Sequence, residues 1–284
     1  MAMRFKNTIK STALRVFPDL ALRLFSIRSR RIIESQARAL KLDELARRVS
    51  RATGGKVAGG PFSGMRLDYE AFPVHGSPKY LGTYERELHS AIERMVELGP
   101  RFVLNIGCAE GFYAVGLAIR LDGACVFAAD ADPKALRATM KNAELNGVLD
   151  RVSSVGIVRP GQLSRYLKAD GSLLVMDCEG AEFDLLDPGN DPILLRTNIV
   201  VEVHPEFGDA RQIVRRFAQT HKISEFRPIG REALDIQVSP INGIDLLKAA
   251  DERTGDKAWL CLEAKFLDSC ADASPPNAER ERGS

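Results

Sequence analysis

The sequence lacks any apolar run that approaches the roughly 18 residues needed to cross a bilayer, so no transmembrane helix is predicted. It also lacks a secretory hydrophobic region and an internal repeat. The five cysteines are odd in number and contain no C-x-x-C pair, which disfavours a disulfide framework and a zinc site. We therefore expect a protein of a reduced, cytoplasmic compartment.

Positive charge is concentrated near the N-terminus. Residues 1–56 hold fourteen Lys and Arg against four Asp and Glu, so this segment carries +10 and the rest of the chain −8. Leucine and phenylalanine recur among these arginines at helical spacing, which predicts a basic amphipathic helical extension over residues 1–52. Through residues 1–51 the extension could lie on an anionic membrane, placing the protein peripherally at the inner membrane surface. The alternatives are a helical cap with solvated arginines and a transit peptide.

Composition divides the remaining chain into three segments. Residues 53–84 are rich in glycine and are predicted to be a linker and pre-domain segment. Residues 85–267 form the predicted main domain, and the polar, proline-bearing residues 268–284 a disordered tail. At 284 residues the chain can bury one substantial core.

From residue 102 onward, apolar strand-like runs alternate with helical patterns. This alternation predicts an α/β fold with a doubly wound, mostly parallel sheet. The strongest helix has Asp132 as N-cap and Pro133 at its first position. The expected strands are 102–106, 124–130, 151–158, 172–177, 198–204 and 257–266, and the expected helices 85–98, 112–120, 133–146 and 209–219.

The stretch NIGCAEG follows the first expected strand and predicts a ligand loop. Gly107 and Gly111 flank the strand-to-helix turn, where glycine lets a ligand approach the backbone. The spacing is G-x-x-x-G and not the G-x-G-x-x-G of dinucleotide loops. Ala109 narrows the approach and Glu110 would repel a pyrophosphate, so NAD and FAD are disfavoured. A ligand with a positively charged sulfonium would not be repelled by Glu110.

Asp130 stands at the end of the second expected strand. A carboxylate at that place can accept hydrogen bonds from both hydroxyls of a ribose. Its alternative role is that of a capping or solvated loop acid, since Asp132 beside it caps the next helix.

Four ordered motifs resemble those of FkbM-type S-adenosylmethionine-dependent methyltransferases. They are VLNIGCAEGFYAVGLA, FAADADPKALRATMKNAELNGV, LLVMDCEGAEFDLLDP and IVVEVHPE, over residues 100–205. The resemblance implies a seven-stranded, Rossmann-like class I methyltransferase fold and S-adenosyl-L-methionine as the cofactor. Asn105 replaces the common Asp of the first motif, and we hypothesise that Glu110 supplies part of the missing charge. The implied cofactor-binding residues are Asn105, Gly107, Cys108, Glu110, Gly111, Phe112, Tyr113, Asp130, Ala131 and Asp177.

The acceptor side is expected at the ends of the fourth and fifth strands. We predict Asp177, Glu179 and His204 as catalytic residues, with Asp177 orienting donor or acceptor and His204 or Glu179 taking the proton. The alternative for His204 is a hydrogen-bonded loop histidine, and Glu182 reads as an acid at a helix N-terminus. Asp177, Glu202 and His204 could bind a divalent metal, but the resembled family does not require one.

The leading interpretation is an O-methyltransferase that acts on a hydroxyl of a sugar, glycan or glycosylated metabolite. The hydroxyl and the glycan come from the resemblance. An RNA methyltransferase is an alternative, but nucleic acid is not expected because the main domain is acidic and lacks the Asn-Pro-Pro-aromatic motif of base-amine methylation. A non-catalytic cofactor-binding domain, tethered to a membrane by the basic arm, is another. The acceptor's identity and the oligomeric state stay open.

Overall fold

The computed structural model describes residues 42–68, 76–168, 170–229, 249 and 257–265. Most of the predicted basic arm and the predicted disordered tail lie outside these residues, so membrane contact through the arm stays a prediction. Among the described residues, no helix has both the length and the apolarity needed to span a bilayer.

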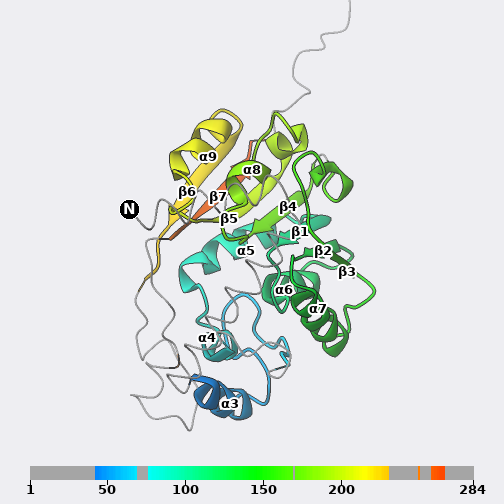
Figure 1. Ribbon diagram of the computed structural model, residues 1–284. Helices are drawn as coiled ribbons and strands as arrows, with labels where there is room; N and C mark the ends of the chain where they lie inside the picture. The colour runs from blue at the N-terminus through cyan, green and yellow to red at the C-terminus, as the bar shows by residue number, and fades with distance from the viewer. Residues whose placement is uncertain (1–41, 69–75, 169, 230–248, 250–256, 266–284) are drawn as a thin grey trace, which may run out of the picture.

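The described residues form a seven-stranded sheet in the order β3-β2-β1-β4-β5-β7-β6 (Figure 1). The first five strands pair in parallel, and β7 lies antiparallel between β5 and β6. The predicted mostly parallel, doubly wound sheet is therefore confirmed. The strands are β1 (Phe102–Ile106), β2 (Cys125–Ala129), β3 (Val152–Val155), β4 (Ser172–Met176), β5 (Asn198–Val203), β6 (His221–Phe226) and β7 (Ala258–Ala264).

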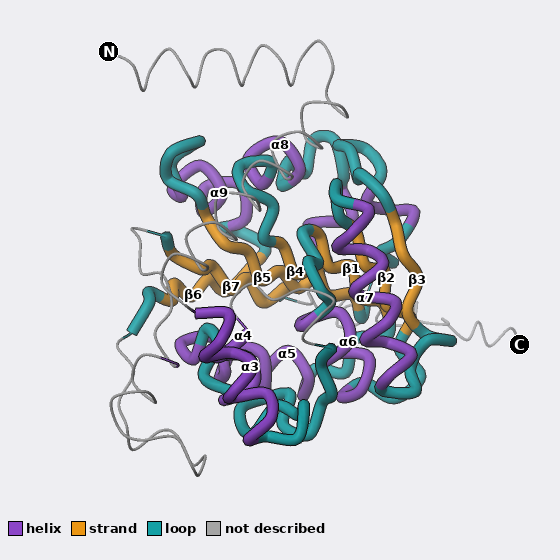
Figure 2. The backbone as a smooth tube through the Cα atoms, turned by 60° about the horizontal axis from the view of Figure 1, so that its bottom comes forward, coloured by secondary structure: helices purple, strands orange, loops and turns teal. Residues whose placement is uncertain are grey.

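Helices cover both faces of this sheet (Figure 2). One face packs α3 to α7 in a single apolar core, and the other packs α8, α9 and two short 3-10 turns. Residues alternate between these cores along the strands, as Val103 and Leu104 do in β1. Central strands buried on both faces explain why their sequences are almost continuously apolar.

The helices follow the sequence pattern closely in the main domain. Asp132 caps α7, because its carboxylate accepts a hydrogen bond from the Lys134 N–H at 2.9 Å. The helices are α3 (Leu42–Ala52), α4 (Gly76–Leu81), α5 (His89–Glu97), α6 (Phe112–Arg120), α7 (Pro133–Leu145), α8 (Glu182–Leu185) and α9 (Ala210–Phe217), with 3-10 turns at η1 (Arg86–Leu88), η2 (Leu163–Arg165) and η3 (Pro192–Arg196).

Strand β6 is absent from the strands expected from the sequence. Its segment HKISEF contains three polar or charged residues whose side chains are exposed or half-buried. It forms an edge of the sheet and pairs only with β7 among the described strands. An edge strand of this kind buries too little apolar surface to stand out as a hydrophobic run.

The described part of the N-terminal region packs directly on the main domain. Leu45 and Val49 of α3 are buried in the same core as α6. The Tyr80 hydroxyl in α4 donates to the Leu67 carbonyl at 2.9 Å, and the Asp68 N–H donates to Asn142 of α7 at 2.8 Å. This region therefore supports the two helices that follow β1 and β2.

Candidate functional site

The loop after β1 touches the loop after β4. Gly107 has φ +78°, and a Cβ there would lie 1.6 Å from the Asp177 carbonyl oxygen. The Asp177 N–H also donates to the Ile106 carbonyl at 2.9 Å. Glycine is thus required because two predicted halves of the site meet at this point.

Helix α7 holds the same loop from the other side. The Thr139 hydroxyl donates to the Ala109 carbonyl at 3.0 Å, and the Asn142 side-chain amide donates to the Glu110 carbonyl at 2.9 Å. A Cβ on Gly111, which caps α6 at φ +86°, would approach Thr139 to 2.8 Å. The loop is therefore fixed by the protein itself.

Asp130 joins the end of β2 to this loop. One carboxylate oxygen accepts the Ala109 N–H at 3.1 Å, and the other accepts the Asp132 N–H at 2.8 Å. Both oxygens of the Asp130 carboxylate therefore hold backbone N–H groups, one in the loop and one at the start of α7. The half-buried Asp130 and Ala131 thus lie at the predicted nucleoside end of the loop.

The structure supplies a local reason for Asn105. Its side chain is 2% exposed within β1, and its amide donates to the Val175 carbonyl of β4 at 3.3 Å. A carboxylate could not donate that bond. The Asn105 Oδ1 atom is buried and has no hydrogen-bond partner among the described residues. The site thus keeps one buried acceptor adjacent to the glycine turn.

Glu110 is already paired within the protein. Its carboxylate forms an ion pair with the Lys79 ammonium of α4, and both side chains are buried. The Lys79 ammonium also lies 4.5 Å from the centre of the Tyr84 ring. Because Lys79 balances this charge, our hypothesis that Glu110 compensates for Asn105 needs correction.

The other predicted cofactor residues of this loop face the protein core. The Phe112 ring packs edge-on against Phe62 at 5.2 Å, and the Tyr113 hydroxyl pairs with Glu85. Cys108 is 3% exposed, and burial raises the pKa of its thiol well above the usual range. Contact of Cys108, Phe112 or Tyr113 with a cofactor stays a prediction.

The three predicted catalytic residues come together at the carboxyl ends of β4 and β5. Ligand atoms of Asp177, Glu179 and His204 all lie within 4.8 Å of one another. The side chains of Asp177 and Glu179 are 35% and 52% exposed, whereas His204 is fully buried. Glu179 also adopts φ +54°, a strained conformation that is common at functional sites.

Glu182 orients the buried histidine. Its Oε1 atom lies 3.0 Å from His204 Nδ1 and accepts the His204 backbone N–H at 2.9 Å. Its Oε2 atom accepts the Gly180 N–H at 2.8 Å. Glu182 is therefore a buried hydrogen-bonding centre, and the interpretation of it as a helix-terminal acid was incomplete.

The balance of burial and neighbouring charges raises the pKa of His204 and of Asp177 and lowers the pKa of Glu202. Burial lowers the pKa of His204, but the Glu182 and Glu202 carboxylates outweigh it and raise the pKa to about 10. Burial raises the pKa of Glu202, but His204 and Lys257 bring it down to about 2. The pKa of Asp177 stands well above its usual range, because Oδ1 is removed from water and Glu202 is close.

Lys257 is a member of the cluster that sequence reasoning missed. Its ammonium donates to Glu202 Oε2 at 3.1 Å and lies 3.0 Å from His204 Nε2. Lys257 precedes β7, which pairs antiparallel with β5 so that Ala258 lies opposite Val203. The start of β7 thus reaches the edge where β5 ends. That antiparallel pairing is the signal that could have identified it.

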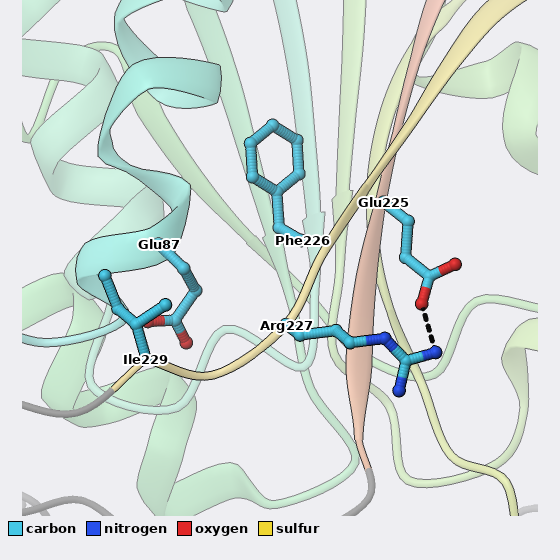
Figure 3. Close-up of a pocket in the computed structure, with 5 residues that line it drawn as sticks. All are labelled: Glu87, Glu225, Phe226, Arg227 and Ile229. Carbon is cyan, nitrogen blue, oxygen red and sulfur yellow. Dashed lines mark ion pairs between the residues drawn. The ribbon is translucent and has the colours of Figure 1, made fainter.

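A surface pocket lies beyond the end of β6. It is lined by Glu87, Glu225, Phe226, Arg227 and Ile229, with an Arg227–Glu225 ion pair at 2.6 Å (Figure 3). The Arg227 side chain is 75% exposed, as in a solvated surface pair. None of the predicted cofactor or catalytic residues lines this pocket.

Known methyltransferases are similar to the part of the chain that contains the loop after β1 and the end of β2. The family described as ribosomal protein L11 methyltransferase (PrmA) matches residues 89–172. A ribosomal protein L11 methyltransferase of Acinetobacter baylyi is 42% identical over 76 residues, 27% of this chain and 24% of that protein. A release factor glutamine methyltransferase of Chlorobaculum tepidum is 34% identical over 108 residues, 36% of this chain and 33% of that protein. These matches span about a quarter to a third of the relatives' length.

Two solved structures are also similar. An O-methyltransferase from Bacillus cereus in complex with SAH has a TM-score of 0.39 and 16% identity, covering 60% of this chain and 78% of that chain. An rRNA methylase from Streptococcus thermophilus has a TM-score of 0.43 and 12% identity, covering 64% and 98%.

The strand order and the methyltransferase match through β1–β3 define the Rossmann-like class I fold of S-adenosylmethionine-dependent methyltransferases. The family match ends at Ser172, the first residue of β4. Asp177, His204 and Lys257 lie beyond it. The family match therefore covers the loop after β1 and the end of β2, but not the carboxylate cluster after β4 and β5. The FkbM-type resemblance, which rests partly on that cluster, stays a prediction.

Proposed function

We propose that the chain is an S-adenosylmethionine-dependent methyltransferase. The observation that carries this proposal is the contact between Gly107 and the Asp177 carbonyl, which joins the loop after β1 to the carboxylate cluster after β4. The Asn105 Oδ1 atom is buried and has no hydrogen-bond partner among the described residues, and the buried Asp177 Oδ1 atom makes no hydrogen bond although it lies 3.5 Å from His204 Nε2. Both atoms suit a ligand with hydrogen-bond donors.

The charges of the site fit this cofactor. Four carboxyl groups, on Asp177, Glu179, Glu182 and Glu202, surround the His204 ring and the Lys257 ammonium. S-adenosylmethionine carries a positive sulfonium and a positive ammonium, and it supplies an electrophilic methyl group. Asp130 would accept the ribose hydroxyls, and Asp177 would receive the ammonium or orient the acceptor.

Proton removal falls to the exposed carboxylates. Asp177 and Glu179 reach solvent, and a raised pKa makes Asp177 a stronger base than an ordinary carboxylate. His204 was our other candidate base, but it is fully buried and both ring nitrogens lie within 3.1 Å of polar neighbours. We therefore assign His204 a positioning role beside Asp177 and Glu179.

The acceptor that we propose is a hydroxyl of a sugar, glycan or glycosylated metabolite. Support comes from the FkbM-type resemblance of DCEGAE and from the carboxylates that could accept a hydroxyl proton. The residues after β4 are Asp177, Cys178, Glu179 and Gly180, and not the Asn-Pro-Pro-aromatic run expected for base amines. A ribosomal protein is the second candidate acceptor, because the matching family is described as acting on protein L11.

Two assays test this proposal. S-adenosylhomocysteine should raise the melting temperature of the protein and NAD should not, because the G-x-x-x-G spacing of the loop is not that of a dinucleotide loop. Labelled methyl groups should then appear in glycan fractions and not in ribosomal proteins or RNA. Transfer to ribosomal protein would reject the hydroxyl acceptor and keep the enzyme class. Stabilisation by NAD alone would reject the class.

The location in the cell is proposed separately. We propose a cytoplasmic protein that contacts the inner membrane surface through residues 1–51. Sedimentation with anionic vesicles should fall when the arginines of this segment are replaced, while binding of S-adenosylhomocysteine should stay unchanged. Equal sedimentation of both proteins would reject the membrane contact.

A further inference from the structure

We propose that the Lys257 ammonium is a built-in cation that takes the place of a divalent metal ion in the cluster after β4 and β5. Lys257 acts as a positioning residue for the Glu179 and Glu202 carboxylates of this cluster. The effect that we infer on catalysis rests on the proposed function. The geometric argument for Lys257 does not depend on that function.

The side chains around Lys257 are of the kind that hold metal ions. Asp177, Glu179 and His204 each present a ligand atom within 4.8 Å of the others. Carboxylate oxygens and imidazole nitrogens are common ligands of Mn²⁺ and related ions. Glu182 accepts from the other ring nitrogen of His204, which is the partner arrangement that orients metal-bound histidines.

The Lys257 ammonium stands where such an ion would stand. Its Nζ atom is 3.0 Å from His204 Nε2, 3.1 Å from Glu202 Oε2 and 3.8 Å from Glu179 Oε1. It therefore contacts two members of that group, His204 and Glu179, and also Glu202. A metal bound to His204 Nε2 would have to displace this ammonium.

Charge explains what the ammonium does there. Lys257 brings a positive charge to a cluster that contains four carboxyl groups around His204. Like charges at such distances repel strongly where water is scarce. Lys257 thus holds the half-buried Glu202 and the exposed Glu179 in one arrangement, and on this inference turnover needs no metal.

The decisive experiment removes the ammonium and offers Mn²⁺ in its place. Lys257→Met and Lys257→Gln should each bind Mn²⁺ at least about tenfold more tightly than the unmodified chain, measured by paramagnetic resonance of the free ion. Mn²⁺ should raise the melting temperature of these variants only. Lys222→Met, which changes an exposed lysine of β6, is the matched control and should behave as the unmodified chain.

Turnover gives a second readout. Chelator should leave the unmodified enzyme active, Lys257→Met should lose kcat with KM for the cofactor little changed, and Mn²⁺ should restore part of it. Lys257→Arg should keep most activity, because a guanidinium also supplies a positive donor at this place.

The inference fails if Mn²⁺ binds the unmodified chain as tightly as Lys257→Met, or binds neither Lys257 variant more tightly. If both variants fold poorly, refolding with Mn²⁺ should recover soluble protein, and failure to recover it would also reject the inference. Failure of every protein to bind S-adenosylhomocysteine, with selective Mn²⁺ binding intact, would instead reject the proposed function alone.

Discussion

The two halves of the site are built in different ways. The cofactor half, around β1 and β2, is shaped by glycine, backbone hydrogen bonds and the short polar side chains of α7. The acceptor half, around β4, β5 and β7, is a cluster of charged side chains centred on a fully buried histidine. In the function that we propose, the first half would recognise the cofactor mainly by its shape, and the second half would set the charge around the reacting groups. Only the first falls within the matched family segment.

The largest effect should come from the point where the halves touch. Gly107→Ala should lower the free energy of unfolding by more than about 4 kcal/mol, because its Cβ would lie 1.6 Å from the Asp177 carbonyl oxygen. Gly123→Ala is the control, since φ is +70° there but nothing lies within 4 Å of the added Cβ. That control should lower the free energy of unfolding, measured by urea denaturation, by about 1–2 kcal/mol. Equal losses would show that the halves are not in close contact.

The acceptor half should depend strongly on one buried carboxylate. Glu182→Gln should destabilise the protein by about 3 kcal/mol, because His204 would lose the fully buried one of its two close carboxylate partners, Glu182 and Glu202. Glu97→Gln changes a side chain that is 67% exposed and should stay within about 0.5 kcal/mol in the same denaturation series. A small loss for Glu182→Gln would contradict the charged character of this half.

The cofactor half also contains a buried ion pair, between Lys79 and Glu110. This pair tests whether charge matters less in the cofactor half than in the acceptor half. Lys79→Met should cost about 3 kcal/mol, because the Glu110 carboxylate would be left buried and unpaired. The double variant Lys79→Met, Glu110→Leu should recover most of that loss in a double-mutant cycle and keep cofactor binding. Loss of binding in the double variant would restore a cofactor role for the Glu110 charge.

A smaller and more specific effect is expected at the end of β2. Asp130→Asn should weaken S-adenosylhomocysteine binding about tenfold, since a charged hydrogen-bond acceptor becomes neutral. Asp150→Asn, at an exposed aspartate, is the control and should bind as the unmodified chain does. Equal affinity in all three proteins would limit Asp130 to holding the loop.

Local patterns in the sequence predicted most of the fold and the position of the loop after β1. The apolar runs identified six of the seven strands, and the capping residues located the start of α7, because both signals lie within short segments. Strand β6 was missed because its segment HKISEF contains three exposed polar residues and forms no apolar run. The glycine spacing identified the loop, but not the reason for Gly107, which is contact with a residue far along the chain.

The acceptor half was predicted only in part. Asp177, Glu179 and His204 follow strands and were recognisable, but their partners come from other segments. Lys257 reaches His204 only through the antiparallel pairing of β7 with β5. The burial of His204 and its orientation by Glu182 likewise depend on tertiary packing, which no local pattern contains.

The central claim is that both halves form one site for S-adenosylmethionine. Calorimetric titration of S-adenosylhomocysteine, with NAD as the competitor, measures it most directly. The account predicts one binding site per chain for S-adenosylhomocysteine, no competition by NAD, and loss of binding in Asp130→Ala and Gly107→Ala. Binding of NAD in preference to S-adenosylhomocysteine, or unchanged affinity in Asp130→Ala, would contradict it.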